Sequence, residues 1–198
     1  MFSNPLFIIL MPLLGIALLP FKNRFRTAYF SVVCLIALIN AFLTINAPIG
    51  SFFNYGLIGF VTDKYTWIFI LSINVSWAFV LGYAFSFEQY KFRQHENKYL
   101  LFLHLSLLAV MANALAENIQ TLLIFYLLAI PISYPLLTIR DDERCKEAAK
   151  GYMIQTLLPP VLMAIPAFII IHLFTHSYSF YTGKTFVDLG VDEEAGIA

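Results

Sequence analysis

Long runs of apolar residues, separated by short polar segments, dominate this sequence. Each run lacks a charged residue in its interior, and the six extend from Pro5 to Pro20, Thr27 to Ile45, Trp67 to Phe87, Tyr99 to Ala116, Ile119 to Ile139 and Gly151 to Phe174. A helix needs roughly 20 apolar residues to cross a hydrocarbon core of about 30 Å. A soluble bundle would need a polar stripe along each helix, and these runs are apolar on nearly all faces. We therefore predict an all-α integral membrane protein with about six transmembrane helices, forming a single domain over residues 1–198.

The positive charges of the connecting segments predict the orientation. Ten of the twelve basic residues fall in alternate segments, namely Lys22, Arg24 and Arg26; Lys91, Arg93 and Lys98; and Arg140, Arg144, Lys146 and Lys150. Basic loops remain on the cytoplasmic side, so we expect both termini to face outward, with an extracellular tail over 175–198. We also expect the first run to stay in the mature protein, because it lacks a small-residue cleavage site. The predicted location is the cell inner (cytoplasmic) membrane.

Two connecting segments carry local signals of their own. The Asn46 to Thr66 segment has glycine and proline turn signals around short aromatic runs, which favours a small extracellular hairpin. The Arg140 to Lys150 segment has opposite charges three and four residues apart, which is typical of a helical extension leading into the sixth run. That extension is either a solvated helix end or a docking surface for a partner.

Composition excludes several functional classes. The chain has 198 residues, 60% of them hydrophobic, and its 12 basic residues balance its 12 acidic ones, so nothing attracts nucleic acid. Cys34 and Cys145 have neither metal-ligand spacing nor a disulfide framework, so we expect no metal and no cofactor. Nucleotide-binding glycine loops and a nucleophile with its base are also missing from the sequence, which argues against independent catalysis.

His104 and a polar stripe in the fourth run are the first candidates for a proton or polar path. An imidazole titrates near neutral pH, so His104 is either a proton relay or a neutral histidine bonded to a neighbouring helix. Ser106, Asn113 and Glu117 share one face of the same run, spaced seven and four residues apart. Such a stripe either packs helices closely or lines a hydrated cavity. Glu117 lies in the tight turn that follows, where exposure would keep it charged.

Prolines in the last two runs predict interrupted helices. Pro131 and Pro135 lie in the fifth run, and Pro159, Pro160 and Pro166 lie in the sixth. Each proline removes a backbone donor and frees a carbonyl one turn earlier. Gln155 and Thr156 stand where the sixth run releases carbonyls, so they complete the candidate path; the alternative is an ordinary kink satisfied by neighbouring side chains.

The stretch from Asp63 to Phe174 resembles the first half of the antiporter-like subunits of respiratory complex I, Mrp-type cation/proton antiporters and group 4 hydrogenases. The motifs that carry the resemblance are Thr62-Asp63-Lys64-Tyr65, Lys98-Tyr99, Ala116-Glu117-Asn118, Pro131-Ile132-Ser133-Tyr134 and Ala149-Lys150-Gly151-Tyr152. The resemblance implies a place in a multi-subunit complex that moves ions or protons, with other membrane subunits and the lipid bilayer as its partners.

Two departures change what the resemblance implies for this chain. The family has a glutamate seven residues before the fifth-helix tyrosine, where this chain has Leu127. Full subunits contain about fourteen helices in two inverted repeats, so the lysine that pairs with that glutamate lies beyond this chain. The implied function is an accessory or split antiporter-like subunit with a mainly structural role.

Two other functions stay open from the sequence. A small homo-oligomeric proton-coupled carrier or channel would use the interrupted fifth and sixth helices, with His104 as its titrating group. A membrane enzyme of lipid or quinone chemistry would need clustered titratable groups, but His104 and Glu117 are thirteen residues apart, about 20 Å along a helix.

Overall fold

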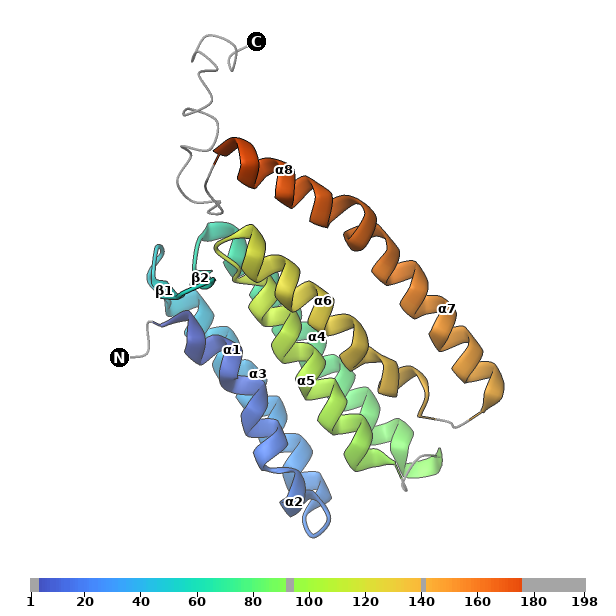
Figure 1. The fold of residues 1–198 in the computed structure, drawn as a ribbon. Coiled ribbons are helices and arrows are strands. Elements are labelled where there is room, and N and C mark those ends of the chain that lie inside the picture. The colour runs from blue at the N-terminus through green and yellow to red at the C-terminus, as the bar shows by residue number, and fades with distance from the viewer. Residues whose placement is uncertain (1–3, 92–94, 140–141, 176–198) are drawn as a thin grey trace.

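The computed structural model describes residues 4–91, 95–139 and 142–175 of the chain as a mostly helical structure (Figure 1). Its helices are α1 (Pro5–Ala17), α2 (Leu19–Lys22), α3 (Arg26–Asn46), α4 (Lys64–Lys91), α5 (Glu96–Ala114), α6 (Ile119–Leu137), α7 (Glu143–Pro159), the π-helical η1 (Pro160–Ala164) and α8 (Ile165–Thr175). A two-stranded antiparallel hairpin, β1 (Phe52–Tyr55) and β2 (Ile58–Val61), lies between α3 and α4.

Within these residues, five helical stretches are long and apolar enough to cross a membrane. They are Pro5–Lys22, Arg26–Asn46, Lys64–Ser86, Ile119–Leu137 and Glu143–Leu173. Five of the six predicted spans are thus confirmed by length and composition. The remaining one, the fourth predicted span (Tyr99 to Ala116), is helical as α5, but its polar first turn and His104 lower its hydropathy.

The long helices lie side by side, and the chain reverses at the two ends of the bundle (Figure 1). The turn from α2 to α3 lies at the same end as the C-terminus of α4 and the N-termini of α5 and α7. The hairpin, the turn from α5 to α6 and the end of α8 lie at the opposite end. Lys22, Arg26, Lys98 and Lys146 therefore gather near one end, whereas Arg93, Arg140, Lys184 and the predicted tail from 176 lie outside the described residues.

Proline acts differently in three helices. The first predicted span is divided at Leu18, between α1 and α2, because Pro20 has no N–H to donate to Ile16. The predicted interruption of the fifth span was wrong, because α6 continues through Pro131 and Pro135. The interruption of the sixth span is confirmed, because η1 separates α7 from α8, and π-helical segments accommodate a disturbed hydrogen-bond ladder.

The hairpin predicted within the long connecting segment is present and is tied to the α5–α6 turn. Phe52 pairs with Val61 and Tyr55 with Ile58, and Gly56 adopts the positive φ of 61° that the turn requires. The Val61 N–H donates to the Leu115 carbonyl at 2.9 Å. This attachment ends α5 two residues earlier than predicted, because Ala116 bridges Phe60 on β2 instead of continuing the helix.

The core lies between α1, α3, α4 and α5. Its largest fully buried side chains include Ile70, Trp77 and Leu81 from α4 and Leu100 and Met111 from α5. Because α5 packs against α1, α4 and α6, it is the central helix of the bundle. The C-terminal run α7–η1–α8 lies along α6 at the periphery (Figure 1).

Candidate functional site

His104 lies in the middle of the central helix, completely shielded from solvent. Its Nδ1 is 2.6 Å from the Leu100 carbonyl oxygen. Because that carbonyl can only accept, Nδ1 carries a proton, and Nε2 is an acceptor when the ring is uncharged. Nε2 has no hydrogen-bond partner among the described residues. The ring also packs edge-on against Trp77, with 5.7 Å between the ring centroids.

Gly15 on α1 provides the space that the His104 ring occupies. A Cβ at this position would overlap Cδ2 and Nε2 of the imidazole. The Gly15 carbonyl accepts a 3.2 Å hydrogen bond from the Tyr29 hydroxyl on α3. The site around His104 therefore depends on a close approach of α1 to α5, which only a residue without a side chain permits.

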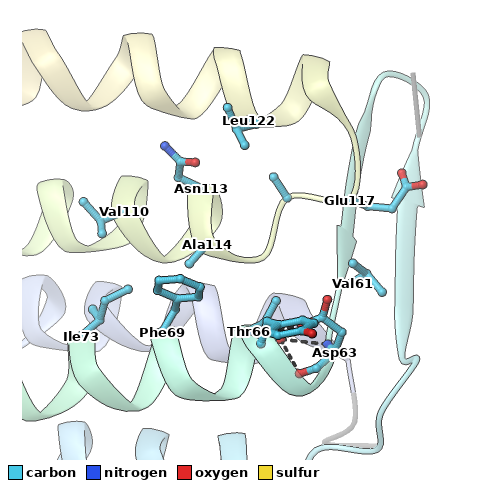
Figure 2. Close-up of a pocket in the computed structure, with 12 residues that line it drawn as sticks. Val61, Asp63, Thr66, Phe69, Ile73, Val110, Asn113, Ala114, Glu117 and Leu122 are labelled. Atoms are coloured by element: carbon cyan, nitrogen blue, oxygen red, sulfur yellow. Dashed lines mark hydrogen bonds between the residues drawn. The ribbon is translucent and has the colours of Figure 1, made fainter. Parts of the chain in front are cut away.

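A cavity of about 620 Å³ lies at the hairpin end of the bundle, between α4, α5 and α6 (Figure 2). Its wall is mostly apolar, with Phe69 and Ile73 on one side and Val110 and Leu122 on another. The Asp63 carboxylate accepts a 2.7 Å hydrogen bond from the Thr66 N–H at the start of α4. Asp63 therefore caps a helix rather than serving the cavity.

Asn113 and Glu117 both border this cavity, but they point in different directions. Figure 2 shows the Asn113 amide directed toward α6 and the Glu117 carboxylate directed toward the hairpin strands. The Glu117 side chain accepts a 3.2 Å hydrogen bond from the Asn118 amide, and its backbone N–H donates to the Gly59 carbonyl at 2.9 Å. Glu117 is only 5% exposed, because β2 covers the turn.

Gln155 and Thr156 do not join the other candidates. They lie on α7, which packs chiefly on α6 and not on the core around His104. Gln155 is exposed, and the Thr156 hydroxyl donates to the Tyr152 carbonyl of its own helix at 2.8 Å. The five predicted path residues thus occupy three separate places: the core, the hairpin-end turn and the peripheral helix.

A buried ion cluster at the basic end of the bundle was missed by the sequence reasoning. The Lys22 Nζ lies 2.9 Å from Glu96 Oε2, and the Arg26 Nε lies 2.9 Å from Glu96 Oε1. The Lys22 and Glu96 side chains are 3% and 6% exposed. Arg26 also donates to the Phe85 carbonyl at 3.1 Å and packs over the rings of Phe30 and Phe85. The sequence analysis used Lys22 and Arg26 only to predict orientation, and their separation of about 70 residues from Glu96 gave no local signal.

Across 4–91, 95–139 and 142–175, His, Cys, Asp and Glu side chains form no group of three that could hold a metal ion. The cavity is lined by apolar side chains together with five polar residues, Asp63, Tyr65, Thr66, Asn113 and Glu117.

No known protein family and no curated protein matched this chain when its sequence was compared with them. The described residues show the class only in outline: a mostly helical structure with five helical stretches long and apolar enough to cross a membrane, which suggests a multi-pass membrane protein.

Proposed function

We propose that this chain is an accessory or split antiporter-like subunit of a membrane complex that moves ions or protons, with a mainly structural and interaction role. In this proposal both termini face outward, α5 also crosses the membrane and brings the number of spans to six, and the basic end of the bundle faces the cytoplasm. The hairpin that leads into α4 and the short polar turn before α6 agree with the motifs of the resemblance.

The exposed face of α7 is the main observation that supports the proposal. In the most apolar part of Glu143–Leu173, 6% of the residues are buried, compared with 33% in Arg26–Asn46. Gly151 and Gln155, four residues apart on this span, are both exposed, and nothing lies within 4 Å of where a Gly151 Cβ would be. A small residue beside an amide at membrane depth is the kind of surface on which another helix packs and hydrogen-bonds.

The arrangement of the polar residues favours a subunit over an independent carrier. A carrier using the last two helices needs titratable or polar groups shared between them and the core, whereas Gln155 and Thr156 lie apart from His104. A partner helix on α7 would give the Gln155 amide the hydrogen bonds that lipid cannot provide. The coupling chemistry then belongs to neighbouring chains.

The proposal predicts that Gly151→Leu prevents assembly without harming the chain itself. The added side chain meets open space within the chain, so the helix tolerates it, but it fills the place of the partner helix. Native electrophoresis of mildly solubilised membranes measures the loss of the large complex, with total chain level as the reference. Gly82→Leu is the matched control, because Gly82 on α4 is equally open and lies elsewhere. If the Gly151→Leu chain still assembled fully into the large complex, α7 would not be the interface with the partner.

A second test uses Leu127, the half-buried α6 residue at the position of the family's glutamate. A structural subunit has no hydrated path at this position, so we expect Leu127→Glu to reduce the amount of chain in the membrane strongly. Leu127→Met, which keeps the volume and polarity, should accumulate normally. Immunoblotting of membranes measures both. Normal accumulation and assembly of Leu127→Glu would indicate a hydrated path and contradict the structural role.

A further inference from the structure

Four deeply buried polar atoms in the core of the bundle lack hydrogen-bond partners within the described residues. They are Asn40 Oδ1 on α3, Asn74 Oδ1 and Trp77 Nε1 on α4, and His104 Nε2 on α5. Each of these side chains is at most 2% exposed. Buried polar atoms in folded proteins are nearly always hydrogen-bonded, to protein or to ordered water.

These atoms belong to one region of the core. Trp77 and Asn74 are three residues apart on the same face of α4, and the Trp77 ring packs against His104. Asn40 reaches α5 as well, because its amide nitrogen lies 3.6 Å from the Met111 sulfur. Met111 is seven residues from His104, so the region extends roughly 10 Å along the bundle axis.

The four atoms cannot satisfy one another. The Asn40 amide donates to the Ile8 carbonyl at 3.2 Å and to the Met111 sulfur at 3.6 Å, and the Asn74 amide donates one of its two N–H groups to the Ile70 carbonyl at 2.9 Å. The two amide oxygens and His104 Nε2 are then three acceptors, and the donors left beside them are the Trp77 N–H and the second Asn74 N–H. Acceptors therefore outnumber donors at these atoms. A small molecule that both donates and accepts hydrogen bonds would satisfy them.

We propose that the core between α1, α3, α4 and α5 holds internal water molecules, bound by Asn40, Asn74, Trp77 and His104. Water supplies two donors and two acceptors, and buried waters typically make about three hydrogen bonds to such groups. The water-binding site lies wholly within this chain, so it stands independently of the proposed assembly. It would give His104 a polar surrounding at membrane depth.

Radiolytic hydroxyl-radical labelling of the intact chain in its native membrane tests the proposal, because radicals form from water and label the side chains beside it. We expect Trp77 to be labelled although it is 1% exposed, at a rate within several-fold of that of Trp67, which is half-buried near the hairpin end. If Trp67 were labelled while Trp77 stayed at the background level, the proposal would be overturned, whatever the variants show.

A pair of substitutions separates internal water from general opening of the bundle. Asn74→Leu keeps the side-chain volume but removes one water ligand, so labelling of Trp77 should fall several-fold relative to Trp67. Asn46→Leu is the matched control, because the Asn46 amide also donates to the carbonyl four residues earlier but is exposed. Labelling of Trp77 that is equal in the native chain and Asn74→Leu would mean that bulk solvent reaches the core, which also contradicts a bound-water site.

Discussion

Glu96→Gln is expected to lower the free energy of unfolding by about 3–5 kcal/mol, the cost of removing one partner from a buried ion pair. Without the carboxylate, Lys22 keeps its charge in a place that is 3% exposed, while Arg26 retains the Phe85 carbonyl and two aromatic rings. Thermal unfolding of the purified chain in mild detergent measures the loss.

Two controls show whether the loss comes from buried charge. Glu143→Gln removes a comparable ion pair, Lys146 Nζ to Glu143 Oε1 at 3.0 Å, but the Glu143 side chain is 83% exposed, so the change should cost at most about 1 kcal/mol. Adding Lys22→Met to Glu96→Gln should restore part of the stability, because it removes the unpaired cation. Equal effects of Glu96→Gln and Glu143→Gln would show that the cluster is hydrated.

Gly15→Ala should destabilise the bundle by roughly 1–3 kcal/mol, the usual cost of overpacking a core. The new methyl group would overlap the His104 ring, and that ring is held by the Leu100 carbonyl and by Trp77. We expect the same unfolding assay to show the loss, and Gly82→Ala, which meets nothing within 4 Å, to show none.

A double-mutant cycle assigns the Gly15 effect to His104. His104→Ala removes the ring that the new methyl group meets, so Gly15→Ala should cost much less in that background than in the native chain. An equal cost in both backgrounds would mean that the strain arises elsewhere along α1.

Hydropathy predicted the helices well because it depends only on local sequence. The run from Trp67 to Phe87 became α4, which extends further at both ends, and the run from Ile119 became α6. The extension before Gly151 is helical from Glu143, with Asp142 accepting a hydrogen bond from the Arg144 N–H. Lys146 Nζ lies 3.0 Å from Glu143 Oε1, an ion pair three residues apart, and Asp142 caps the helix.

The candidate site was predicted less well because it depends on contacts between distant segments. His104 was found from its polarity within an apolar run, but nothing local indicated that Gly15 would pack on it. Glu117 is buried because a strand some 60 residues earlier covers its turn. The partnership of Glu96 with Lys22 and Arg26 likewise required the packing of α5 against the first helices, which a single sequence does not encode visibly.

The central claim, that this chain works as a subunit among other membrane proteins, is tested most directly by affinity capture of the chain from its native membrane after mild-detergent extraction. Mass identification then shows which proteins migrate with it and in what ratio. We predict other multi-pass subunits, of the hydrogenase, quinone-reductase or Mrp type, at fixed stoichiometry. Recovery of a homo-oligomer without partners would contradict the account and favour an independent carrier or channel.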